Sequence, residues 1–201
     1  MKKIRSKDLA EQLQADTRQV LLTAHYLLHE DPEILLQQPA PGKWSIAQVI
    51  EHLNTYGRYY LPLMAKAIKE KNLPPAVYFT PGWLGNYFTN SMLPNQQGKV
   101  TNKMKAFKNH RPSPDIDSKQ VLDEFIEQQK LLLELLEKVP HTDLNAIRIP
   151  ISIASFIKLK LGDVFRFIIA HHQRHFVQIQ NNLLALNVPF TQLNNLGYTA
   201  H

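Results

Sequence analysis

VFRFIIAHHQRHFVQI, residues 164–179, is the most apolar of four stretches in which hydrophobic side chains recur every three or four positions. That spacing places the apolar side chains on one face of an α-helix. The stretch opens near Leu161-Gly162-Asp163, and we expect its helix to end around Asn187-Val-Pro189. It is one of four helices that the sequence predicts.

The three other stretches with helical periodicity cover residues 7–29, 45–71 and 118–140. Ser45 can cap the second of them while Gln48, three residues later, reaches back to the chain, and Pro62 should kink the same helix. The spacers between the helices are too long for tight turns. The sequence therefore predicts an all-α fold, a four-helix bundle with long crossover connections.

The chain is predicted to form a single domain over residues 1–201, with a long irregular insertion at about 73–117. The first half of this insertion is rich in aromatic residues and should pack on the bundle, with a short helix near 83–93. It could cover the mouth of a site or reach a partner subunit. The second half is basic.

Composition limits the classes of function. The chain has no cysteine, so any metal must be held by His, Asp or Glu, and the protein supplies no thiol nucleophile. No apolar run approaches the length of a membrane span and the N-terminus lacks an apolar core, so we expect a cytoplasmic protein with no membrane partner. The formal net charge is +6, but no nucleic-acid-reading motif accompanies the basic residues, so nucleic acid is an unlikely partner. The basic residues that lie in the insertion are Lys99, Lys103, Lys105, Lys108 and Arg111.

Three histidines are candidates for a metal site. His171 and His175 lie four residues apart, so one face of a helix can present both imidazoles to one ion. His52 lies among apolar residues of the second helix, where a polar ring needs a partner. That partner is either a metal or a buried hydrogen bond. His172 points about 100° away from His171 and is the weaker candidate.

Two motifs carry a family resemblance. Gly42-Lys-Trp-Ser-Ile-Ala-Gln-Val-Ile-Glu-His-Leu53 precedes Leu161-Gly-Asp-Val164 and the pair His171-x-x-x-His175. In this order they resemble the DinB-like superfamily of metal-binding four-helix bundles. The resemblance implies that His52, His171 and His175 bind one divalent metal ion, zinc or nickel, in a protein that is often a homodimer.

The chemistry that the resemblance implies depends on an open position. Three neutral imidazoles leave the metal its full charge and at least one free site, as in catalytic zinc sites. Metal-bound water or thiol would then be the reactive group. Characterised members look like transferases that couple a low-molecular-weight thiol cosubstrate to small electrophiles, which makes an S-transferase the leading prediction. The alternatives are a metal-dependent hydrolase and a non-catalytic metal- or ligand-binding stress protein.

Further residues are assigned around the histidines. Gln178 could orient a ligand ring by accepting its second N–H, and Glu51 is a weaker candidate for the same role. Arg174 could bind an anionic substrate, or be a solvated surface residue, and Tyr56 could line the pocket or pack the edge of the core. His25 and His29 form a second pair outside the family pattern. No role is assigned to His110, His141, Asp143 or His201.

Overall fold

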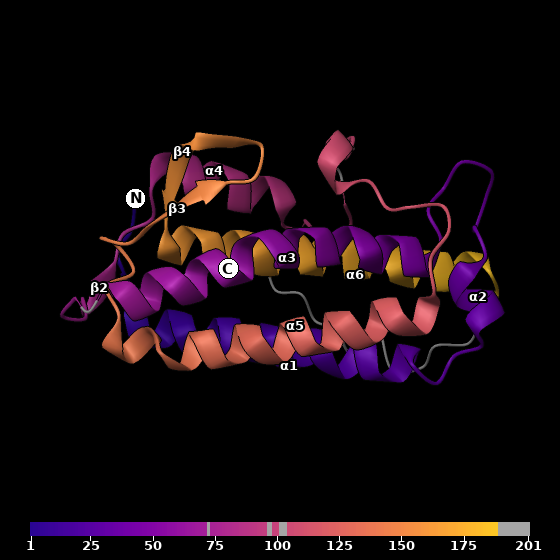
Figure 1. Cartoon of the computed structure of the whole chain (residues 1–201), viewed down its shortest axis with the longest axis horizontal. Helices are drawn as coiled ribbons and strands as arrows, with labels where there is room; N and C mark the ends of the chain where they lie inside the picture. The colour runs from indigo at the N-terminus through magenta and orange to yellow at the C-terminus, as the bar shows by residue number, and fades with distance from the viewer. Residues whose placement is uncertain (72, 96–97, 101–103, 189–201) are drawn as a thin grey trace.

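Four long helices dominate the computed structural model, which describes residues 1–71, 73–95, 98–100 and 104–188 (Figure 1). The all-α prediction is confirmed, because the described residues are mainly helical and the sheets are small. His201 and Lys103 lie outside the described residues, as does the last part of the predicted 1–201 domain. The long helices are α1 (Ser6–Leu27), α3 (Ile46–Glu70), α5 (Ser118–Glu137) and α6 (Leu161–Ala185).

The order of the helices in space differs from their order in the chain. Helix α1 packs against α5 and α6, and α3 packs against the same two helices, so α1 and α3 lie diagonally opposite. Figure 1 shows α1 and α6 running in one direction and α3 and α5 in the other. This arrangement requires connections that cross the ends or the length of the bundle, and each carries short elements of its own. The first connection carries α2 (Pro32–Leu36).

Side-chain caps explain where two of the helices begin. Ser45 caps α3 by accepting a hydrogen bond from the backbone N–H of Gln48, and the Gln48 side chain accepts one from the N–H of Ser45. This reciprocal pair is the capping box that the sequence predicts. Asp117 caps α5 in the same position by accepting from the N–H of Gln120. Helix α3 continues through Pro62 and ends at Glu70.

The insertion after α3 folds mostly onto α6. It contains β2 (Tyr78–Phe79), α4 (Trp83–Met92) and the 3-10 helix η1 (Lys108–His110), so the predicted short helix is confirmed. Strand β2 pairs with β1 (Ile4–Arg5). Helix α4 is fixed at its start by Asp163 of α6, whose Oδ2 accepts the N–H of Gly82 at 2.8 Å.

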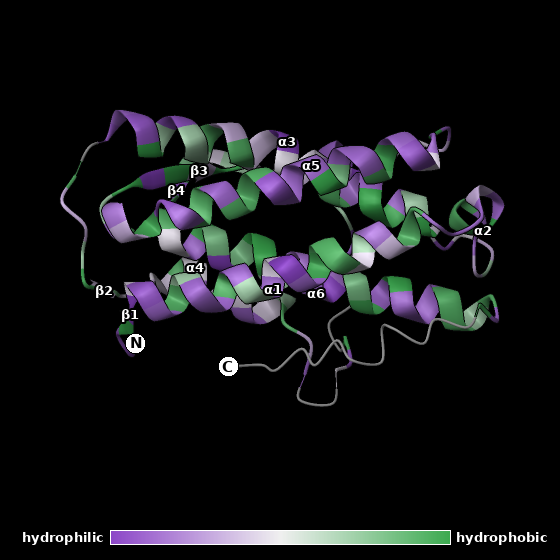
Figure 2. Cartoon of the chain, turned by 90° about the horizontal axis from the view of Figure 1, so that it is seen from below, coloured by the Kyte–Doolittle hydropathy of each residue, from purple (hydrophilic) through white to green (hydrophobic). Residues whose placement is uncertain are grey.

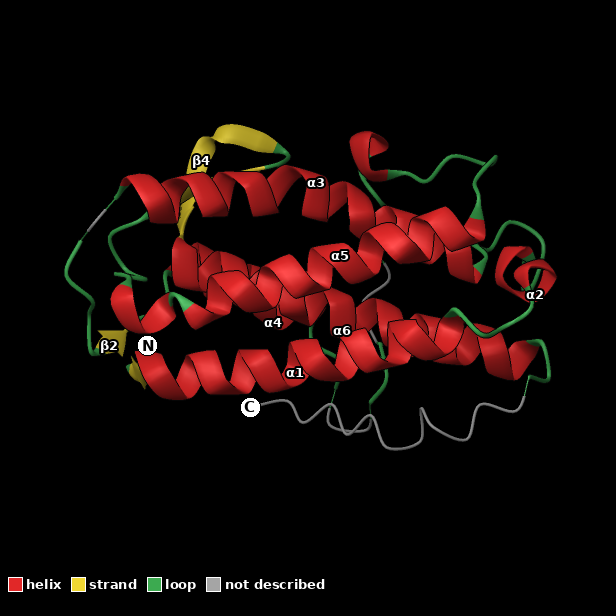
Figure 3. Ribbon diagram, turned by 60° about the horizontal axis from the view of Figure 1, so that its bottom comes forward, coloured by secondary structure: helices red, strands yellow, loops and turns green. Residues whose placement is uncertain are grey.

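A β-hairpin between α5 and α6 was not predicted. Strands β3 (Arg148–Ile151) and β4 (Ala154–Lys160) pair antiparallel after the 3-10 helix η2 (Val139–His141). Figure 3 shows β4 beside α3, and the strands also contact α4 and α6. Apolar residues alternate along this segment, as Ile149, Ile151 and Leu159 illustrate. The strands are too short to compete with the helical periodicity on either side, which is why the hairpin was missed.

The apolar core is divided into two clusters. One lies toward the hairpin and ends at Tyr56 on α3 and Ala170 on α6, while the other begins at Leu53 and Phe176 on the same two helices. The polar and apolar stripes along the long helices are visible in Figure 2. A layer of histidines lies between the two clusters, in the middle of the bundle. None of the described helices combines the length and hydrophobicity needed to cross a bilayer.

Gly162 is expected to be intolerant of a side chain. A Cβ at this position would lie 2.5 Å from the ring of Phe79, which is fully buried. Gly162→Ala should therefore lower the free energy of unfolding by about 1–3 kcal/mol, as overpacking of a core does. Urea denaturation measures the loss. Adding Phe79→Leu makes room for the methyl group, so the double variant should be more stable than the sum of the two single losses predicts. Strictly additive losses would contradict the proposed contact.

Candidate metal centre

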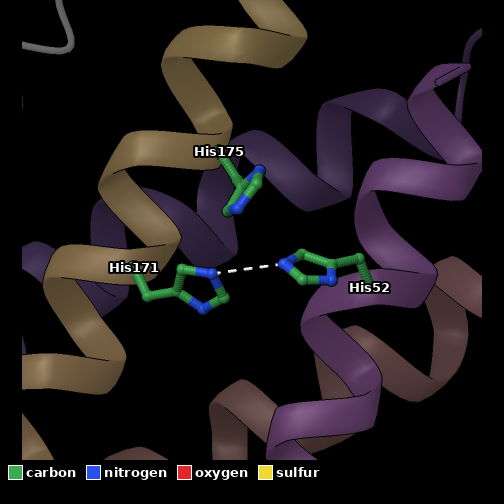
Figure 4. Close-up of side chains that lie close together, drawn as sticks. All are labelled: His52, His171 and His175. Atoms are coloured by element: carbon green, nitrogen blue, oxygen red, sulfur yellow. Dashed lines mark hydrogen bonds between the residues drawn. The ribbon is translucent and has the colours of Figure 1, made fainter. Parts of the chain in front are cut away.

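Helices α3 and α6 bring three imidazoles together at the middle of the bundle (Figure 4). His52 projects from α3 toward His171 and His175, which lie one turn apart on α6. The Nε2 atoms of His52 and His171 are 3.2 Å apart, and one nitrogen from each of the three rings lies within 4.8 Å of the others. It is the one group of this kind in the part of the chain that the structure describes.

Hydrogen bonds fix the orientation of two of the rings. His52 Nδ1 lies 2.6 Å from the backbone oxygen of His110, and His175 Nδ1 lies 2.9 Å from Oε1 of Gln178. Both oxygens can only accept, so each Nδ1 carries the proton and each Nε2 keeps its lone pair. The hydrogen bond predicted for Gln178 is therefore present. Without a metal, His171 Nε2–H donates to His52 Nε2, which is the contact drawn in Figure 4.

Burial keeps the imidazoles neutral. It is the largest cause that lowers the pKa of His52 to about 4 and holds the pKa of His171 and His175 well below the usual value. The positive charge of Arg174 lowers the pKa of His171 and His175 further. Nε2 of His52 and Nε2 of His175 consequently keep free lone pairs at neutral pH, and neutral His171 offers its Nε2 lone pair once its proton moves to Nδ1.

The donor set fits a divalent transition metal. Four-coordinate zinc binds imidazole nitrogen at about 2.0–2.1 Å, which places neighbouring ligand nitrogens roughly 3.3 Å apart. The 3.2 Å between the Nε2 atoms of His52 and His171 is close to this separation. Outer hydrogen bonds such as those made by Nδ1 of His52 and His175 are usual for metal-binding histidines. The three histidines could therefore hold a metal ion.

Aromatic rings form the walls of the histidine group. The Trp44 ring lies 5.1 Å from that of His52, and Phe167 stacks on His171 at 5.8 Å. Tyr56 is nearly buried, with its ring 4.5 Å from His171 and 5.3 Å from His52. Tyr56 thus lies beside the histidines and also belongs to the core cluster on the hairpin side, so its role in lining a pocket stays a prediction. Burial raises the pKa of its hydroxyl.

Several other candidates lie outside the group. Glu51 forms an ion pair with Arg58 at 2.8 Å and does not contact the histidine rings through any described hydrogen bond. His25 on α1 and His29, two residues after the end of α1, are both exposed. His172 is buried against the Phe125 ring, where desolvation lowers its pKa to about 3.

The burial of Arg174 and the packing of the insertion differ in part from what the sequence predicts. Arg174 is only 8% exposed, so the reading as a solvated surface residue is wrong, while its role toward an anion stays a prediction. The aromatic part of the insertion packs on α6, where the Phe88 ring contacts Phe167, the residue that stacks on His171. The basic part reaches His52 directly, through the backbone oxygen of His110.

His110 is the residue that sequence reasoning missed. It is 4% exposed, its carbonyl binds His52, and its ring stacks on Tyr56 with 3.8 Å between centroids. It lies 58 positions from His52 in the chain, and the contact uses a backbone oxygen, which any residue has. No spacing pattern could have identified it.

Two cavities among the described residues lie away from the three histidines, which line neither of them. The larger, about 750 Å³, lies between α1, α4 and α6 near Arg5 and Arg166. The other, about 500 Å³, lies beside the end of α3 near Lys66 and His141. The three histidines are themselves buried, with 3%, 4% and 9% of His52, His171 and His175 exposed.

The fold and the site define a class: helical-bundle proteins with three histidines that could bind a metal between two helices. A sequence model of the DinB superfamily matches residues 9–179, a span that contains all three histidines. The chain belongs to the DinB superfamily. No curated protein and no solved structure matches it.

Proposed function

We propose that this chain is a metal-dependent enzyme that transfers a low-molecular-weight thiol to small electrophiles. The observation that carries the proposal is the convergence of three neutral imidazole nitrogens with no carboxylate in the group. Zinc and nickel are the proposed metals, since imidazole suits both. The DinB superfamily supplies the context but not the reaction.

The charge of the site favours an anionic cosubstrate. Three neutral ligands leave the double positive charge of the ion uncompensated inside a low-dielectric core. When bound, the metal would supply Lewis acidity that favours the deprotonated form of a thiol or a water. The chain has no cysteine, so no thiolate of its own competes for that position.

Tyr56 is the proposed protein contact for the substrate. Burial raises the pKa of its hydroxyl, so the phenol stays protonated at neutral pH and can donate a hydrogen bond. Its ring touches His171 and His52, which places it at the edge of the group. Arg174 is proposed to favour anions near His171 and His175 through its charge.

Loss of a model electrophile tests the proposed activity. Zinc- or nickel-loaded protein is incubated with monochlorobimane and a panel of thiols that includes bacillithiol, mycothiol and cysteine. We expect thiol-dependent conjugation that disappears in His171→Ala and persists in His141→Ala, whose side chain is exposed and far from the group. Turnover of an ester without thiol would instead support a hydrolase. No conjugation with any thiol would contradict the transferase proposal.

The burial of the histidines favours a second candidate, a non-catalytic metal-binding protein. His52, His171 and His175 are all buried, and a substrate must reach an open position on the metal to react. A protein side chain bound at the fourth coordination position of the metal ion would support this candidate. The homodimer stays a proposal in either case, and α4 and β4 offer exposed aromatic surface for it at Trp83, Tyr87 and Phe156.

A further inference from the structure

We infer that His110 is a positioning residue of the metal centre: its backbone oxygen sets the His52 ring, and its imidazole holds that oxygen in place. The inference rests on the proposed metal binding by His52, His171 and His175. It concerns a residue that would not itself bind the ion. Three sets of contacts carry it.

The first contact is the hydrogen bond from His52 to His110. The 2.6 Å between His52 Nδ1 and the His110 oxygen is short for a bond that nitrogen donates to oxygen. It fixes the proton on Nδ1 and turns the lone pair of Nε2 toward His171. If this oxygen moved away, the proton could occupy either nitrogen, and His52 would present the wrong tautomer to an ion part of the time.

The second set of contacts holds the His110 ring at both nitrogens. Nδ1 lies 2.9 Å from Oγ1 of Thr55, and Nε2 lies 2.9 Å from Oγ of Ser152. The Thr55 hydroxyl donates to the backbone oxygen of His52 at 2.7 Å, so its oxygen accepts the proton of His110 Nδ1. Nε2 of His110 then accepts from Ser152. Both nitrogens of a neutral imidazole are satisfied.

The third set ties this arrangement to the hairpin. Ser152 lies in the turn between β3 and β4, and its backbone N–H donates to the hydroxyl oxygen of Tyr60 at 3.1 Å. Tyr59 donates from its hydroxyl to the backbone oxygen of Ile151 at 3.3 Å. Two residues of α3 thus hold the turn that holds His110. The hairpin thereby has a role in the site, although none of its side chains reaches the three histidines.

A purely structural role for His110 makes a different prediction. If the ring only fills space beside Tyr56, removing its hydrogen bonds while keeping an aromatic ring should leave metal affinity unchanged. His110→Phe makes this change. Ser152→Ala removes one of the same bonds from a residue that contacts none of the three histidines through a described hydrogen bond.

The test compares zinc affinity in the full-length chain by competition with a chromophoric chelator. The variants are His110→Phe, Ser152→Ala and their combination. The matched control is His141→Phe, because His141 is the exposed last residue of η2 as His110 is the buried last residue of η1. The absorption spectrum of the cobalt-loaded protein reports the ligand geometry, and thermal unfolding of the metal-free protein reports the fold.

We expect each single variant to bind zinc roughly 10-fold more weakly, the usual effect of losing an outer partner of a metal-binding histidine. The double variant should lose little more than His110→Phe alone, since both changes remove the same bond. The cobalt spectrum should shift in both variants and not in the control. Folded variants with wild-type affinity and spectrum would overturn the inference, as would an effect confined to a His110→Phe protein that unfolds while Ser152→Ala binds normally.

Nitrogen-15 spectra of the metal-free protein separate this inference from the proposed function. Wild-type His52 should be the neutral Nδ1–H tautomer, and the variants should show a mixture. If the wild type binds no zinc, the proposed function fails, and these spectra still decide whether His110 sets the ring. A pure Nδ1–H tautomer in folded His110→Phe and Ser152→Ala would overturn the inference by itself.

Discussion

Replacing His175 with alanine is expected to lower the affinity for zinc or nickel by more than about 100-fold, since loss of a ligand should cost more than loss of an outer hydrogen-bond partner. His175 supplies one of three converging nitrogens, and two imidazoles cannot enclose an ion in this core. His52→Ala should have the same effect, although His52 lies on a different helix. Chelator competition measures both affinities.

The control for this prediction is His25→Ala. His25 and His29 have the same four-residue spacing as His171 and His175, but both are exposed, and His29 lies beyond the end of α1. The control should bind metal like the wild type. A His52→Ala protein that retained wild-type affinity would show that α6 binds the ion alone, and equal losses in His25→Ala would show that the effect is not specific to the group.

Lowering the pH from 7.5 to 4.5 should strongly destabilise the metal-free protein. The pKa of His52 is about 4 and that of His172 about 3 in the folded state, both below the value near 6.5 of the unfolded chain. The unfolded state therefore takes up protons first. The stability that these residues contribute is complete above pH 6.5 and falls as the pH drops toward the folded pKa, by roughly 2–3 kcal/mol for each residue at pH 4.5.

Urea denaturation across this pH range measures the effect, and His172→Leu isolates one titrating group. His172 packs against Phe125 and is not one of the three histidines that could hold a metal. Leucine can therefore fill its space without removing a candidate ligand. The stability of this variant should depend less steeply on pH, by about 1.4 kcal/mol per pH unit between pH 6 and 4. A pH dependence equal to that of the wild type would mean that His172 is not held neutral by burial.

Local patterns in the sequence account for what could be predicted. The helices follow from the hydrophobic periodicity and from the Ser45 cap. That His171 and His175 share one face follows from their four-residue spacing on a helix. The prediction that His52 joins them required the family resemblance, because nothing in the sequence states which helices are neighbours. The contact between Gln178 and His175 was predictable for the same reason as the pair, since three residues span about one turn.

What the sequence could not predict are contacts made by the backbone and across long connections. The His110 oxygen that binds His52 belongs to a 3-10 helix of three residues, and its position depends on the turn at Ser152. Both lie in connections whose course is set by packing on the bundle rather than by local preference. The diagonal placement of α1 and α3 is a property of this packing as well.

X-ray absorption spectroscopy at the metal edge tests the central claim most directly, because it counts the imidazole ligands of the ion in the wild-type protein. For the zinc- or nickel-loaded chain we predict three imidazole nitrogens at about 2.0–2.1 Å, with any remaining position filled by an oxygen from water. Fewer than three imidazoles, or an ion surrounded mainly by oxygen, would contradict a metal centre made by His52, His171 and His175.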